Sequence, residues 1–169
     1  MIKYDIEALE YISKLSEGGL RDAITMLDKC LSYNTDLTLE NVVKALGTVD
    51  YEQMKQLTDG VLSQYALQCI DVIEEVHRSG KDMKQFINLY TQFLLDIQKY
   101  RLTASGDYIQ IPATDENLNW LEKLQDEDYE VCLDLLNSMV KLNSAVKWSQ
   151  TPKYDLEAEL LLFAMEDGE

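Results

Sequence analysis

The stretch "SEGGLRDAITMLDKC", residues 16–30, joins a flexible break in the chain to the start of an amphipathic helix. Gly18 and Gly19 relax the entry of the chain, and the free backbone N–H groups of the first helical turn favour anions. Arg21 lies in that turn. Residue types alone leave two interpretations open: either Asp22 complements the helix dipole while Arg21 is solvated, or Arg21 takes part in binding an anion.

Apolar residues at spacings of three and four recur almost everywhere outside this stretch, which predicts an all-α fold. Only two prolines and few glycines interrupt the pattern. The segment 104–117 breaks the helical rhythm, and we expect an ordered loop or a short extended strand there. The expected helices begin near Asp5, Leu20, Thr38, Asp50, Tyr65, Asp82, Asp115, Glu127 and Asp155, with Asp5, Thr38, Asp50 and Asp115 as N-caps.

The charge of the chain is strongly acidic. Its 169 residues include 31 acidic and 15 basic side chains, a formal net charge of −16. Such a surface repels phosphate backbones and anionic lipid heads, so we do not expect the chain alone to bind nucleic acid strongly. The ten tyrosines could stack on bases. Those near helix ends, such as Tyr65 and Tyr129, have no arginine nearby in the sequence, and packing explains them better.

The cysteines, the apolar runs and the motifs of the sequence indicate the compartment and the chemistry of the protein. Cys30, Cys69 and Cys132 are widely spaced and read as buried thiols in a reducing compartment. No signal peptide or apolar run long enough to span a bilayer is present, so we expect a cytoplasmic protein with no membrane partner. The sequence has no phosphate-binding loop, and its one histidine, His77, is expected to end a helix. We therefore predict no catalytic residues and no metal site.

Longer segments around the opening stretch resemble a known protein family. The segments "ALEYISKLSEGGLRDAITMLDKCLSY" and "LTLENVVKALGTVD" resemble the lid of the tau/gamma subunits of the bacterial DNA polymerase III clamp loader, which are AAA+ ATPases. The match continues through "GKDMKQFINLYTQFLLDIQKY" to "SQTPKYDLEAELLLFAME", which is similar to the closing helix of the collar domain of that family.

This resemblance implies a partial three-helix AAA+ lid at residues 1–47 and a helical collar, or oligomerisation, domain at residues 48–169. It implies that Arg21 is the sensor-2 arginine, which reaches from the lid to the γ-phosphate of ATP, with Gly18 and Gly19 as the hinge that aims it. ATP and Mg²⁺ would belong to the parent protein, with no cofactor in this chain. The expected role is subunit assembly and nucleotide sensing during sliding-clamp loading in DNA replication.

The same resemblance limits the expected activity and partners. The family's phosphate-binding loop and acidic metal-binding strand are missing from this sequence, so we do not expect this chain alone to be an ATPase. Its expected partners are other clamp-loader subunits, through the collar, with the sliding clamp and primer-template DNA reached only through the whole assembly. Two alternatives stay open: an acidic all-helical adaptor unrelated to replication, and a small enzyme with an unrecognised site.

Overall fold

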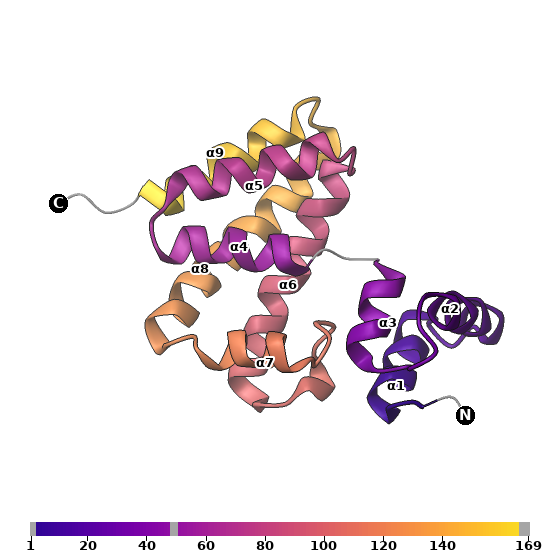
Figure 1. Ribbon diagram of the computed structural model, residues 1–169. Coiled ribbons are helices and arrows are strands. Elements are labelled where there is room, and N and C mark those ends of the chain that lie inside the picture. Colours follow the sequence, from indigo (N-terminus) through magenta and orange to yellow (C-terminus); the bar gives the residue numbers. More distant parts are fainter. Residues whose placement is uncertain (1–2, 48–50, 166–169) are drawn as a thin grey trace. The chain divides into compact units, whose positions relative to one another are not determined.

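The computed structural model describes residues 3–47 and 51–165, and these residues are predominantly helical (Figure 1). No β-strand occurs among them, only an isolated parallel bridge between Tyr4 and Leu37. None of the described helices is long and apolar enough to cross a membrane. The helices are α1 (Ile6–Leu15), α2 (Leu20–Tyr33), α3 (Leu39–Leu46), α4 (Tyr51–Leu62), α5 (Ala66–Arg78), α6 (Met83–Thr103), α7 (Asp115–Glu122), α8 (Asp126–Ala145) and α9 (Pro152–Met165), with short 3-10 turns η1 (Gly106–Tyr108) and η2 (Val146–Trp148). The predicted all-α class is confirmed.

The chain divides into two compact units. One comprises Met1–Val49 and Pro112–Leu118, the other Asp50–Ile111 and Asn119–Glu169. In the first unit, α1, α2 and α3 pack against one another. Lys29 of α2 donates a hydrogen bond to the carbonyl oxygen of Leu46 at 3.2 Å, which satisfies an acceptor in the last turn of α3. The buried core of this unit is Ala8, Tyr11, Ile12, Cys30, Leu37, Leu39, Val42 and Leu46.

In the second unit, α6 and α8 pack along each other, and α5 packs against both α4 and α9 (Figure 1). The centre of α6 is buried on more than one face, as its sequence predicts. Tyr90 is fully buried, and its hydroxyl lies 3.0 Å from the hydroxyl of Thr58. Because Thr58 donates to the carbonyl of Met54 at 2.9 Å, Tyr90 is the donor in that pair. The one polar atom of this ring is thereby satisfied inside the core.

Helices α4 and α5 approach so closely that one position has no room for a side chain. A Cβ added to Gly60 would lie 2.8 Å from the Sγ of Cys69, less than real Cβ atoms allow. Cys69 and Cys132 are buried free thiols, as predicted, and burial raises their pKa values to about 11 and about 12. These thiols stay protonated and pack as small apolar groups.

Two expected helix starts are wrong by one to three residues. Helix α7 begins at Asp115 itself, and the hydroxyl of Thr114 accepts the backbone N–H of Asn117 at 3.2 Å, so Thr114 is the cap instead of Asp115. Helix α9 begins at Pro152, three residues before the expected Asp155, because proline suits the first helical position. Asp5 occupies the predicted N-cap position without a side-chain hydrogen bond. The expected cap at residue 50 lies outside the described residues.

The segment after α6 is an ordered loop with one 3-10 turn, and a single buried carboxylate anchors its end. Asp96, on α6, is 2% exposed. Its Oδ2 atom accepts the backbone N–H groups of Gln110 at 2.7 Å and Ile111 at 3.1 Å, and Lys99 lies 3.5 Å from its Oδ1 atom. The sequence showed only that the helical pattern breaks here, because nothing local indicates which distant side chain receives the loop.

We predict that Asp96→Ala lowers the free energy of unfolding by about 2–3 kcal/mol, because it removes two charge-assisted hydrogen bonds and leaves buried N–H groups unsatisfied. Urea unfolding measures the loss, and hydrogen exchange at Gln110 and Ile111 locates it. Asp134→Ala, which removes an exposed carboxylate on α8, is the matched control and should change stability by less than about 0.5 kcal/mol. Equal effects of the two variants would contradict the anchoring role.

Candidate functional site

The turn between α1 and α2 reverses the chain immediately before Arg21. Glu17 and Gly18 both have positive φ, 48° and 83°, and Gly19 is the extended N-cap residue of α2. The N–H of Gly19 donates to the carbonyl of Ser16 at 2.7 Å, which closes the turn. Two consecutive left-handed residues turn the chain within a few positions, and Gly18 takes the more extreme conformation without steric cost.

Gly19 lies close to its neighbours, so a side chain at this position would be crowded. A Cβ on this residue would lie 3.1 Å from both the Oδ2 atom of Asp22 and the carbonyl oxygen of Ser16. Because Gly19 has no side chain to cap α2, the carboxylate of Asp22 in the first turn is the group that complements the helix dipole. The structure therefore agrees with the part of the first interpretation in which Asp22 complements the helix dipole.

The guanidinium of Arg21 projects from this first turn and is exposed. No described residue forms an ion pair or hydrogen bond with its side chain, while its backbone carbonyl accepts the hydroxyl of Thr25 at 2.9 Å. Leu20 and Ile24, on the same exposed part of α2, are 76% and 50% exposed. The arrangement therefore offers a free cation with apolar neighbours to a group outside this unit.

The charged residues around the end of α5, including the His77 noted in the sequence, form ion pairs or face solvent and do not make a reactive cluster in the described part of the chain. His77 is exposed in the last turn of α5, where it was expected. Glu74 pairs with Lys153 of α9 and, at 3.8 Å, with Arg78. The hydrogen bond from Lys153 holds the pKa of Glu74 below its ordinary value. Within the described ranges, no group of three or more His, Cys, Asp or Glu residues is placed to hold a metal ion.

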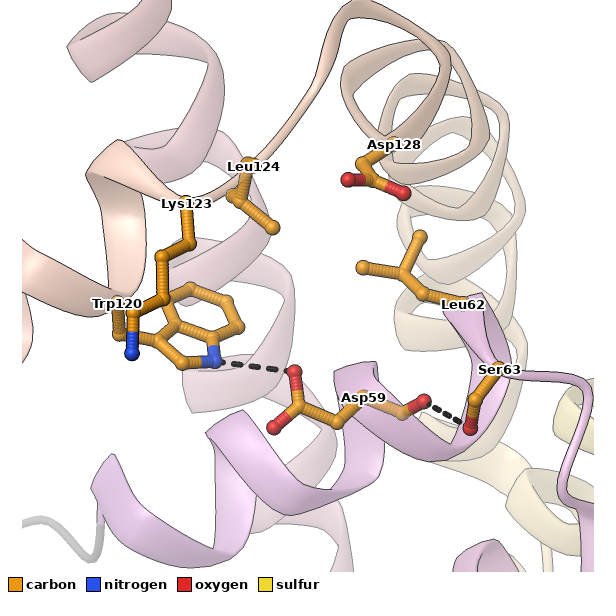
Figure 2. A pocket seen from close by; sticks show the side chains of 7 residues that line it. All are labelled: Asp59, Leu62, Ser63, Trp120, Lys123, Leu124 and Asp128. Carbon is orange, nitrogen blue, oxygen red and sulfur yellow. Dashed lines mark hydrogen bonds between the residues drawn. The ribbon is translucent and has the colours of Figure 1, made fainter.

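A groove in the second unit was not anticipated from the sequence. It has a volume of about 490 Å³ and lies between α4, the end of α7 and the start of α8 (Figure 2). The indole N–H of Trp120 donates to the Oδ1 atom of Asp59 at 3.0 Å across it. These two residues are far apart in the chain, and no local pattern in the sequence pairs them. The lining residues are Asp59, Leu62, Ser63, Trp120, Lys123, Leu124 and Asp128.

Apolar side chains are also exposed along the last two long helices. On α8, Val140 is 52% exposed; on α9, Leu162 is 60% and Met165 70% exposed. Residues 160–165, in the second half of α9, are all apolar and so cover every side of the helix, whereas the buried residues of α9 are Leu156, Leu160 and Ala164. A helix that is apolar all round is usually covered on all sides, so these faces are suited to contact with a partner.

The matching sequence model and two of the relatives found by comparison point to the same family. The sequence model described as "DNA polymerase III subunits gamma and tau domain III" matches residues 37–165. DNA polymerase III subunit tau of Bacillus subtilis (strain 168) is 24% identical over 160 residues, which cover 91% of this chain and 27% of that protein. DNA polymerase III subunit gamma of Buchnera aphidicola subsp. Baizongia pistaciae (strain Bp) is 34% identical over 80 residues, 45% of this chain and 22% of that protein.

A further relative comes from outside the bacteria. The replication factor C small subunit of Staphylothermus marinus is 28% identical over 142 residues, which cover 72% of this chain and 43% of that protein. The chain thus spans about a quarter of the length of the tau and gamma relatives and less than half of the replication factor C subunit.

The turn geometry gives Gly18 and Arg21 different expected contributions to stability. We predict that Gly18→Ala destabilises the first unit by about 1–2 kcal/mol, because any other residue is strained at positive φ. Arg21→Ala should change stability by less than about 0.5 kcal/mol, because the side chain is exposed and without a partner among the described residues. Hydrogen exchange of the amides in α2 measures both, and a large loss of protection in Arg21→Ala would contradict the assignment.

Proposed function

This chain belongs to the family of DNA polymerase III gamma and tau subunits, matched over domain III, and from this premise we propose that it is a lid and collar segment of a clamp-loader subunit. In this role it helps to hold the loader subunits together and senses nucleotide during sliding-clamp loading in DNA replication. Family membership does not favour the alternative of an acidic adaptor unrelated to replication.

The observation that carries the nucleotide-sensing part is the free guanidinium of Arg21. It lies at the start of α2, it has no partner among the described residues, and the left-handed turn at Glu17 and Gly18 comes immediately before this helix. A guanidinium stays charged and offers several donors to phosphate oxygens. We assign Arg21 the sensor-2 role, with Gly18 and Gly19 as the turn that aims it, in a lid fragment at residues 1–47.

The proposal gives this segment the sensing of ATP and leaves the binding of ATP and Mg²⁺ to the rest of the parent protein. Arg21 is a single cation, and no cluster of metal ligands occurs within the described ranges. In our proposal the nucleotide and its metal are held by another part of the parent protein, and Arg21 contacts the γ-phosphate from the lid. A change in that contact would alter the position of the lid, which is how nucleotide state would reach the rest of the assembly.

The assembly part of the proposal rests on the exposed apolar faces of α8 and α9. We propose that residues 48–169 form the collar domain and bury Val140, Leu162 and Met165 against other clamp-loader subunits. The sliding clamp and primer-template DNA would be reached through the whole assembly, because a net charge of −16 opposes direct binding to DNA. The bacterial cytoplasm is the compartment that fits this role.

We predict that Arg21→Ala in the full-length subunit lowers the rate of ATP-dependent clamp loading about 10-fold or more, because a charge-assisted contact to phosphate is lost. Clamp loading on primed DNA by the reconstituted loader is the measurement. Lys44→Ala, which removes an exposed cation from α3, is the matched control and should load at the rate of the unmodified subunit. Unchanged loading by Arg21→Ala in an intact assembly would refute the sensor-2 role.

For the collar, we predict that Leu162→Glu weakens assembly with the other loader subunits at least about 10-fold, because it places a carboxylate in an apolar contact. Light scattering of the mixed subunits measures this. Leu102→Glu, at a position on α6 that is 85% exposed, serves as the control and should assemble normally. Normal assembly by Leu162→Glu would show that this face of α9 is not the contact.

A further inference from the structure

The groove beside Trp120 is lined entirely by residues of the second unit, whereas Arg21 belongs to the first. Its walls come from three elements: the end of α4, the last turn of α7 with the residues that follow, and the first turn of α8 (Figure 2). A volume of about 490 Å³ is within the range of pockets that hold small ligands or single large side chains, about 300–1,000 Å³.

Two carboxylates are held in fixed positions at this groove. The Oδ1 atom of Asp59 accepts the indole N–H of Trp120 at 3.0 Å. The Oδ2 atom of Asp128 accepts the backbone N–H of Gln125 at 2.8 Å, as part of the capping box of α8. Each carboxylate keeps its other oxygen without a donor among the described residues. Two acceptors are therefore positioned before any ligand arrives.

The negative charge of the groove is not neutralised by its own lysine. Lys123 lines the groove but forms no ion pair of 4.0 Å or less with either carboxylate within the described part of the chain. Burial raises the pKa of Asp59, and the carboxylates of Glu52 and Asp128 act in the same direction, against the hydrogen bond from Trp120 and the charge of Lys55. A cation in the groove would offset the cost of keeping Asp59 ionised.

Besides the two carboxylates, Ser63 and Lys123, the groove has an apolar wall of Trp120, Leu62 and Leu124, and this wall favours one kind of cation. Trp120 packs on Phe93, with ring centroids 5.6 Å apart, and remains half-buried, as do Leu62 and Leu124. A planar guanidinium on a methylene stem fits such walls, because it stacks on aromatic faces and spans two acceptors. An ammonium group is compact and more strongly hydrated, so it gains less from the same surroundings.

We propose that this groove binds an arginine side chain presented by a partner protein, with the guanidinium attracted by the carboxylates of Asp59 and Asp128 and the stem against Trp120, Leu62 and Leu124. Charge complementarity identifies the partner segment as basic, since the chain itself carries a net charge of −16. The inference goes beyond the proposed function and is independent of it, because no step of it uses Arg21 or nucleotide.

The test uses the whole chain with Trp148→Phe, which leaves Trp120 as the only tryptophan; Trp148 is 87% exposed and lies outside the groove. The blocked tripeptide Ac-Gly-Arg-Gly-NH₂ is titrated while Trp120 fluorescence and the indole N–H signal in NMR are recorded. We expect saturable changes with this peptide, at least about fivefold weaker binding of the lysine peptide, and no saturable change with the neutral citrulline peptide.

Variants of the groove decide the roles of its carboxylates. Asp59→Asn combined with Asp128→Asn removes both charges while leaving an amide oxygen to accept from Trp120, and it should weaken binding of the arginine peptide at least about tenfold. Asp134→Asn, on the exposed face of α8, is the matched control and should bind like the parent. Urea unfolding of each variant verifies that it is folded. Absence of saturable binding, equal binding of the citrulline peptide, or undiminished binding by the double variant would overturn the proposal.

Discussion

The second unit depends on one constraint: the central part of α6 must be covered on more than one face. Tyr90, Leu94 and Ile97 are fully buried, so the helices that pack on α6, chiefly α8 and also α9, have little freedom in how they lie against it. The hydroxyl of Tyr90 adds a directional requirement, because it has to meet Thr58 to avoid a buried unsatisfied donor. An aromatic series of Phe86, Tyr90 and Phe93 continues this core to Trp120 at the groove, with ring centroids 5.6–6.4 Å apart.

The same constraint explains how far the sequence could predict the fold. Apolar spacing revealed the helices because each one buries a stripe that recurs with the helical period, and α6 stood out because its stripe was too wide for one face. Caps were less certain because neighbouring residues compete for the same position. Thr114 and Asp115 are both capping residue types, and only the backbone geometry shows that Thr114 accepts the N–H group.

The sequence did not reveal which polar residues pair with partners far away in the chain. Asp96 receives the loop at residues 110–111, and Asp59 receives the indole of Trp120, a residue 61 positions away. Tyr129 has no arginine near it in the sequence, yet the guanidinium of Arg101 lies 5.2 Å from the centre of its ring. Each pair joins side chains that local periodicity treats as ordinary surface or core residues. The groove was missed for this reason, whereas the turn before Arg21 was found because glycine marks it locally.

The two candidate sites share one energetic property that distinguishes them from the core. Glu17 and Gly18 hold a left-handed turn, and Asp59 keeps a carboxylate in a place where burial raises its pKa. The ionised form of Asp59 is therefore penalised above the raised pKa, and the penalty shrinks as pH falls from that pKa to the ordinary carboxyl pKa. Because Asp59 is exposed, solvent keeps this penalty small. By contrast, Asp96 and Tyr90 have their buried polar atoms satisfied within the fold. A group such as Asp59, whose pKa stays raised in spite of the hydrogen bond from Trp120, is one that a ligand outside the fold can stabilise further.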